Sequence, residues 1–251
     1  MTRRLPPLLA LLLLAIPAPA RQNLPPGVFT DRTVMLVGEL PEADLIALTT
    51  AHAAAGGTPG VLLLDTPAAR PHLPAFLRRL HADRLVTVGA FPDSDPRTRL
   101  GLGADVPLAS SSATYADALA LLFPKPERVV VAPAEPREQF LRAAALAGAV
   151  GAPLFPLRNA DDLAALRQRL EAAKPKELLL IGAAIQSSAG SSAEKRSEFP
   201  DAESMAARRL DELTRRGPVK TLVTVNPWPD QDRAGLASLG PWLATKRRAA
   251  L

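Results

Sequence analysis

Four short polar side chains, each placed just after an apolar run of strand length, are the candidate ligand-binding residues of this sequence. They are Glu39, Asp65, Glu135 and Asn226. Carboxylates and amides at the ends of parallel strands face the crevice in which open α/β sheets bind ligands. Short polar residues at such positions also cap helices or turn the chain. We favour this second interpretation, because position in a fold is weak ground for a function.

The histidines and the lack of cysteine narrow the chemistry further. His52, His72 and His81 stand without a serine-nucleophile motif or metal-ligand spacing, and His72 and His81 are nine residues apart, too far for a pair on adjacent helical turns. The sequence contains no cysteine, which excludes disulfides, zinc–thiolate sites and thiol nucleophiles. We therefore expect no catalytic set, no metal site and no cofactor, and interpret the histidines as surface or packing residues.

The N-terminus has the three-part layout of a secretory signal. Arg3 and Arg4 precede an apolar stretch over residues 8–16, which is followed by Ala18-Pro19-Ala20. The apolar stretch is too short to cross a bilayer, which needs roughly 20 residues. We expect residues 1–20 to be a signal peptide. The mature chain would then lie at the cell surface, in the cell wall or in the periplasm, without an integral membrane segment.

The net charge of the chain limits the classes of partner to expect. The formal net charge is +5, and the basic residues are scattered along the sequence. Such a thin excess argues against nucleic acid as a partner. It is compatible with weak attraction to an acidic wall polymer.

A repeat with a period well above that of helical solenoids organises the chain. The apolar run at residues 34–37 returns 95 residues later at 129–132, and 93 further on at 222–225. The run at 85–90 returns 93 residues later at 178–183. We divide the chain into a first repeat over 21–108, a second over 109–200 and the start of a third, truncated repeat over 201–251.

Each repeat reads as an α/β unit in which strands alternate with helices. Continuously apolar strands indicate a small parallel sheet that helices cover on both faces. We predict three-stranded parallel layers over 33–89 and 128–182, with the same strand order. Pro156 predicts an edge position for the strand at 154–157. Asn159 predicts the cap of a helix over 160–173.

Three further expectations concern the helices and loops between these strands. A helix over 74–82 should turn Phe76, Leu77 and Leu80 inward. Helices over 115–122 and 202–215 should link successive repeats, and residues 186–200, rich in serine, glycine and charge, should form an exposed loop. The third repeat should provide a strand at 222–225 and a helix near 230–243, and then stop, leaving an open apolar edge.

The second unit resembles the type 2 cell-wall-binding repeat. Residues 128–132 read Arg-Val-Val-Val-Ala, an alanine-rich helix leads into Gly151-Ala152-Pro153, and residues 176–182 read Lys-Glu-Leu-Leu-Leu-Ile-Gly. In outline the resemblance covers residues 31–251, with Ala90 and Ala183 where the family has a second glycine. It implies Rossmann-like units that pack together, usually in three copies, and hold surface proteins to anionic wall polymers without covalent bonds.

These observations lead us to expect a secreted, non-catalytic binding or adhesion module that associates with a cell-wall or envelope polymer. Two alternatives remain open. One is a periplasmic receptor that clamps a small molecule between Rossmann-like lobes. The other is the N-terminal part of a larger envelope hydrolase.

Overall fold

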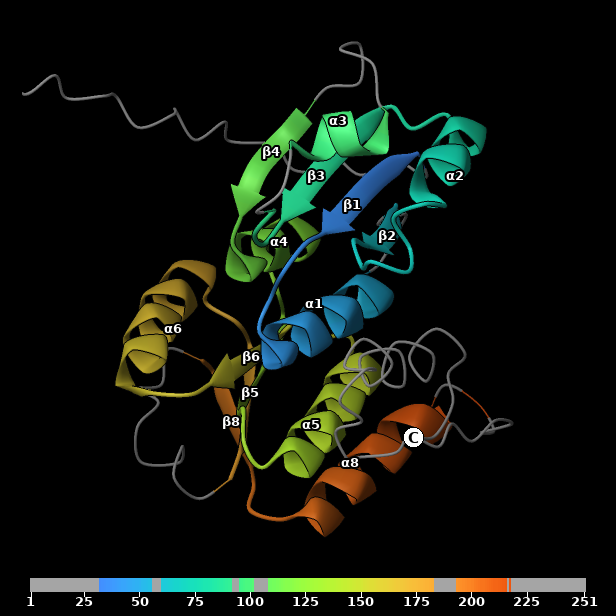
Figure 1. Cartoon of the computed structure of the whole chain (residues 1–251). Helices are drawn as coiled ribbons and strands as arrows, with labels where there is room; N and C mark the ends of the chain where they lie inside the picture. Colours follow the sequence, from blue (N-terminus) through green and yellow to red (C-terminus); the bar gives the residue numbers. More distant parts are fainter. Residues whose placement is uncertain are drawn as a thin grey trace, which may run out of the picture.

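Two four-stranded parallel sheets form the framework of the protein (Figure 1). The computed structural model describes residues 32–55, 60–91, 95–101, 108–182, 193–215 and 217. The first sheet has the order β2-β1-β3-β4 and the second has the order β6-β5-β7-β8. The strands are β1 (Thr33–Val37), β2 (Val61–Leu64), β3 (Arg84–Val88), β4 (Leu108–Ala113), β5 (Arg128–Pro133), β6 (Leu154–Leu157), β7 (Glu177–Ile181) and β8 (Lys195–Phe199). The predicted parallel α/β architecture and common strand order are confirmed.

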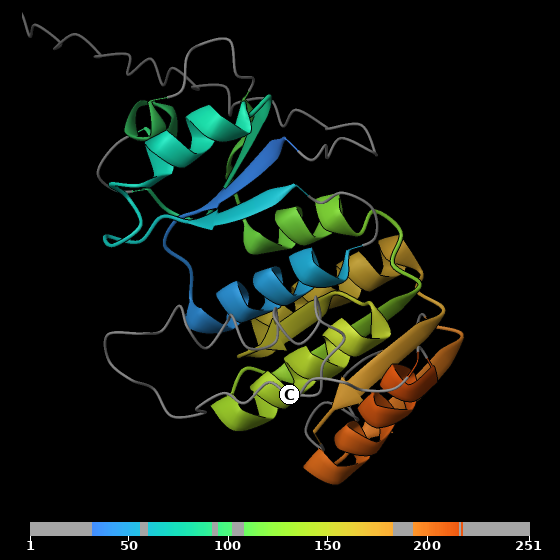
Figure 2. The same ribbon diagram turned by 90° about the vertical axis from the view of Figure 1, so that its right-hand side faces the viewer.

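Helices flank both sheets, so that each unit is layered (Figure 2). We call the first sheet with helices α1–α4 the first unit, and the second sheet with α5, α6 and α8 the second unit. The helices are α1 (Glu42–Ala54), α2 (Leu73–Leu80), α3 (Pro96–Leu100), α4 (Tyr115–Leu122), α5 (Arg137–Val150), α6 (Ala160–Ala173) and α8 (Ala202–Arg215). The linking helices predicted at 115–122 and 202–215 are both present.

Each sheet has a fourth strand that the apolar pattern did not predict. Residues 195–199 were expected in an exposed loop, and this expectation is wrong, because they form β8 beside β7. Lys195 and Glu198 are exposed while Phe199 is buried. A strand at the margin of a sheet has one neighbour and tolerates polar side chains. The polar composition of this segment therefore led to the wrong expectation of a loop.

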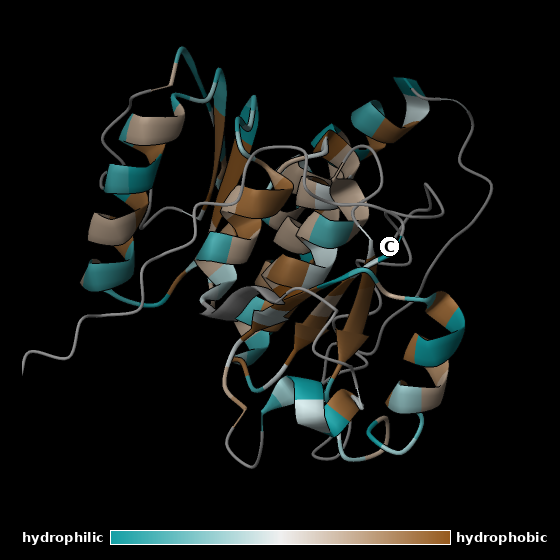
Figure 3. Ribbon diagram, turned by 90° about the horizontal axis from the view of Figure 1, so that it is seen from above, coloured by the Kyte–Doolittle hydropathy of each residue, from teal (hydrophilic) through white to brown (hydrophobic). Residues whose placement is uncertain are grey.

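Alternate residues of the inner strands β1, β3, β5 and β7 enter separate cores on the two faces of their sheet. In β1, Val34 and Leu36 pack on α2 and α3, whereas Met35 and Val37 pack on α1 and α4. In β7, Leu178 and Leu180 pack on α6, whereas Leu179 and Ile181 face α5 and α8. This is the burial on both faces that parallel sheets require. Figure 3 shows hydrophobic strand segments between helices that carry hydrophilic stretches.

Helix α1 joins the two units because it is buried on both sides. Leu48 and Ala51 face the first sheet, while Ile46 and Ala47 belong to the core formed with α5 and the second sheet. The helix packs directly against α4, α5 and β6. A helix between two sheets needs apolar residues around its circumference, and α1 is buried almost continuously from residue 44 to residue 53.

Local signals set the ends of two helices, and the cap predicted at Asn159 is confirmed. The Asn159 side chain accepts a hydrogen bond of 2.9 Å from the backbone N–H of Asp162, which caps α6. Gly151 ends α5 with φ 69°, a left-handed conformation that glycine adopts without steric cost. Pro156 lies on β6, which is an edge strand as predicted. Residues 1–20, expected to be a signal peptide, and the strand and helix expected at 222–225 and 230–243 lie outside the described residues.

Candidate functional site

The polar residues predicted at the strand ends are divided between the two sheets. Glu39 and Asp65 follow β1 and β2, Glu135 follows β5, and Asn226 lies outside the described residues. Asp65 is buried, accepts a hydrogen bond of 3.1 Å from Arg70 Nε and forms an ion pair with Arg99. These contacts tie the end of β2 to α3, which matches the structural interpretation of Asp65.

Glu39 and Glu135 are exposed and serve the chain in different ways. The backbone of Glu39 exchanges hydrogen bonds of 2.9 and 3.0 Å with Ala90, which joins the ends of β1 and β3. Glu135 lies in the turn that leads into α5. Ligand binding by Glu39, Asp65, Glu135 and Asn226 stays a prediction.

The junction between the two units holds a set of charged residues that sequence reasoning missed. Glu42 and Asp44 lie in the first turn of α1. Arg137, at the start of α5, donates to Glu42 Oε1 from Nη2 at 2.8 Å, and Arg158, just after β6, forms an ion pair with Asp44 and lies 3.4 Å from Asp162 Oδ2. The carboxyl ends of β1, β5 and β6 therefore meet where the two units pack together.

Burial governs the ionisation of the groups at this junction. Desolvation raises the pKa of Asp44 above its ordinary value, although the hydrogen bond and charge of Arg158 oppose the shift. Tyr115 packs against the cores of both units, and burial, assisted by the charge of Asp44, raises the pKa of its phenol. The phenol therefore stays neutral, and Asp44 gives up a proton less readily than an exposed aspartate.

A second buried acid lies at the opposite end of the second sheet. Burial opposes ionisation of Glu177 at the start of β7, but a hydrogen bond of 3.0 Å from Ser197 Oγ and the charges of Arg208 and Lys195 hold its pKa below the ordinary value. Arg128 Nε lies 3.3 Å from its carboxylate. This cluster joins β5, β7, β8 and α8.

The outer face of α2 combines an exposed aromatic ring with basic side chains. Phe76 was expected to point inward, and this prediction is wrong, because 44% of the residue is exposed while Leu77 beside it is buried. Leu73 and Leu77 are buried in the core under the first sheet and Leu80 packs against this core partly buried, so the inward orientation is confirmed for Leu77 and Leu80. Arg79 and His72, three residues after and four before Phe76, are also exposed.

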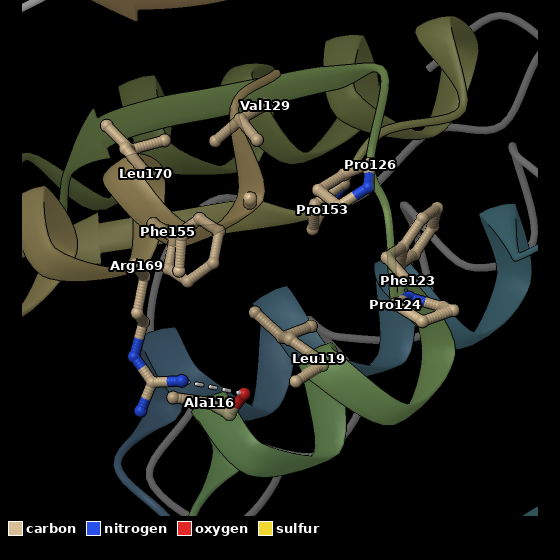
Figure 4. A pocket seen from close by; sticks show the side chains of 13 residues that line it. Ala116, Leu119, Phe123, Pro124, Pro126, Val129, Pro153, Phe155, Arg169 and Leu170 are labelled. Carbon is tan, nitrogen blue, oxygen red and sulfur yellow. Dashed lines mark hydrogen bonds between the residues drawn. The ribbon is translucent and has the colours of Figure 1, made fainter. Parts of the chain in front are cut away.

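A pocket of about 250 Å³ opens between the two units, and apolar side chains form most of its wall (Figure 4). Helix α4 forms one side, and β6 with the end of α6 forms the other. Arg169 is the one charged residue that lines it. The lining residues are Ala116, Leu119, Ala120, Phe123, Pro124, Pro126, Val129, Pro153, Phe155, Arg169, Leu170, Ala172 and Ala173.

Two features of the described ranges limit the kind of site to expect. No group of three or more His, Cys, Asp or Glu side chains there is arranged to hold a metal ion. No helix in the same ranges has the length and apolar character needed to cross a membrane. His52 is buried in α1, whereas His72 and His81 are exposed at the ends of α2.

Comparisons with known proteins identify related folds. The chain is similar to Cwp6 from Clostridium difficile, with a TM-score of 0.52 and 16% identity over 87% of this chain, and to Cwp8 from the same organism, with a TM-score of 0.50 and 16% identity over 88%. It spans 37% of the Cwp6 chain and 40% of the Cwp8 chain. No protein-family model and no curated protein matches the sequence. At this identity the likeness shows a common fold.

Proposed function

We propose that this chain is an exported, non-catalytic module that binds an anionic polymer of the cell wall or envelope. The observation that carries the proposal is the fold shared with Cwp6 and Cwp8, which are cell-wall proteins. The same likeness supports the resemblance of its two units to degenerate copies of the type 2 cell-wall-binding repeat. The signal-like layout of residues 1–20 supports the export that we propose.

The pairing of the buried acids with arginines supports a non-catalytic role. Asp44, Asp65, Glu177 and Glu212 are buried, and each forms an ion pair with at least one arginine. An acid held by guanidinium groups in a packed interior serves stability more readily than proton transfer. These ion pairs support the part of the proposal that gives the buried acids structural roles.

The outer face of α2 is the surface at which we expect the polymer to bind. Phe76 offers an exposed ring on which an apolar sugar face can pack. Arg79 lies one turn further along the same helix face and supplies a cation for an anionic substituent. Arg78 and His81 are exposed nearby. A polymer that combines sugar rings with phosphate or carboxylate groups fits this mixture of ring and charge.

Co-sedimentation with purified cell walls tests the proposal. The full chain without residues 1–20 should sediment with walls that retain their anionic polymers, and binding should fall after acid extraction of those polymers and at high salt. Phe76→Ala and Arg79→Gln should each weaken binding. Leu210→Ala is the matched control, because Leu210 is an exposed apolar residue on α8, far along the chain from α2.

Three results would contradict the proposal. Failure of the protein to sediment with the walls would show that it does not bind a wall polymer. Equal sedimentation before and after acid extraction would exclude the anionic polymer as the partner. Hydrolysis of wall material by the purified chain would favour the envelope-hydrolase alternative.

A further inference from the structure

The pocket between α4 and α6 has a definite structural origin. Small side chains line both facing helices, with Ala116 and Ala120 one turn apart on α4 and Ala172 and Ala173 at the end of α6. Larger side chains at these positions would fill the space between the units. The turn between α4 and β5 contains Pro124 and Pro126, whose rings form part of the rim. The gap is therefore built into the way the two units meet.

The wall of the pocket is suited to an apolar group. Leu119 and Leu170 form buried parts of the wall, and the rings of Phe123 and Phe155 line it from opposite sides (Figure 4). An engineered apolar cavity of about 150 Å³ accommodates benzene. By proportion, a volume of about 250 Å³ accommodates a ligand of about ten non-hydrogen atoms.

One end of the pocket is positively charged. Arg169 Nη1 donates to the carbonyl oxygen of Ala116 at 3.3 Å, and Arg169 Nη2 lies 3.9 Å from Asp117 Oδ1. Both contacts are long for a guanidinium. Asp117 is already engaged at the start of α4, where Oδ2 accepts 2.7 Å and 3.2 Å hydrogen bonds from the hydroxyl and backbone N–H of Thr114. The Arg169 side chain is 39% exposed, and its guanidinium has donors to offer a ligand at the mouth.

The neighbouring strand argues against a peptide as the occupant. Strand β6 is at the edge of its sheet, which is where an added peptide strand would pair. Pro153 and Pro156 lie at the start of this strand and within it and provide no N–H donor. The edge next to the pocket is therefore a poor template for strand addition, and the pocket favours a small molecule.

We propose that this pocket binds a small organic monoanion, with an apolar body of about ten non-hydrogen atoms between α4 and α6 and its carboxylate on Arg169. The site is separate from the α2 face and does not depend on polymer binding. The ligand would lie at the junction between the units, in contact with α4 of the first unit and with β6 and α6 of the second.

A nuclear magnetic resonance titration of the full chain without residues 1–20 tests the site. The probes are phenylacetate and hexanoate, each compared with its uncharged amide. We expect saturable shifts with the acids at millimolar concentrations and much weaker shifts with the amides. Arg169→Gln should lower the affinity for phenylacetate about tenfold, as expected for the loss of a hydrogen bond between charged groups.

Two further variants separate the pocket from general effects. Ala120→Phe places a ring in the pocket from an exposed helix position, so the fold should persist while binding is lost. Arg167→Gln removes an exposed guanidinium from the same helix outside the pocket lining and should leave binding unchanged. The proposal is overturned if neither acid gives saturable shifts, if the amides bind as well as the acids, or if Ala120→Phe binds normally.

Discussion

Arg137 donates to Glu42 Oε1 from both Nε, at 3.0 Å, and Nη2, at 2.8 Å, and so joins the first residues of α5 and α1. The two residues are 95 apart, the same spacing that separates the first two recurring apolar runs. Corresponding positions of the two units thus face each other across the junction with opposite charges. Glu42 also compensates the unfavourable placement of a cation at the N-terminus of a helix.

Reversing this ion pair tests its contribution to the junction. Glu42→Arg alone should destabilise the chain by about 1 kcal/mol through repulsion of Arg137, because the pair is partly exposed. Adding Arg137→Glu should restore much of the loss. Urea unfolding of both single variants and the double variant gives the coupling energy. The Glu138–Arg142 pair on the open surface of α5 is the control and should show weaker coupling. Additive effects at Glu42 and Arg137 would contradict the prediction.

The buried Asp44 predicts a decline of stability with rising pH. Its pKa is raised in the folded protein, so the folded state holds the proton more tightly than the unfolded state. This contribution is complete below the ordinary value of 3.8 and is lost as the pH rises through the folded pKa. Asp44→Asn cannot titrate. The stability of Asp44→Asn relative to the natural protein should therefore increase between pH 4 and pH 7, as measured by urea unfolding. A constant difference would show that burial does not dominate at Asp44.

Glu177 predicts the opposite dependence on pH. Its pKa is lowered in the folded protein, so its contribution is present above the ordinary value of 4.5 and is lost as the pH falls through the folded pKa. Glu177→Gln should be less stable than the natural protein by about 2 kcal/mol at neutral pH, as expected for hydrogen bonds to a charged group. The difference should shrink in acid. Glu203→Gln, an exposed change on α8, is the control. A deficit that persists undiminished at low pH would refute the electrostatic explanation.

Close packing of α1 predicts intolerance of larger side chains. Ala47 is fully buried in the core that α1 shares with α5 and the second sheet. Ala47→Leu should destabilise the protein by about 1–3 kcal/mol, because overpacking forces side chains and backbone to shift. Ala75→Leu makes the same change on the exposed face of α2 and should be nearly neutral. Thermal unfolding distinguishes the two variants, and equal stability would mean that the two units are not closely packed at α1.

The apolar runs determined the α/β class, the parallel strands and their common order, because a strand buried on both faces needs an unbroken apolar sequence. The cap residue Asn159 likewise acts through its immediate neighbours, so local sequence was sufficient to place it. The edge strand β8 escaped detection because one exposed side allows Lys195 and Glu198 in it.

Tertiary structure alone decided which residues meet between the units. The contact of Asp44 with Arg158 spans 114 residues, and no local pattern specifies a partner at that distance. The exposure of Phe76 and the burial of α1 on both sides depend on which surfaces neighbouring elements cover. The pocket beside Arg169 exists because α4 and α6 present alanines to the same space. Local sequence set the elements, whereas the packing of one unit on the other set the charged junction and the cavity, because both are formed by residues far apart in the chain.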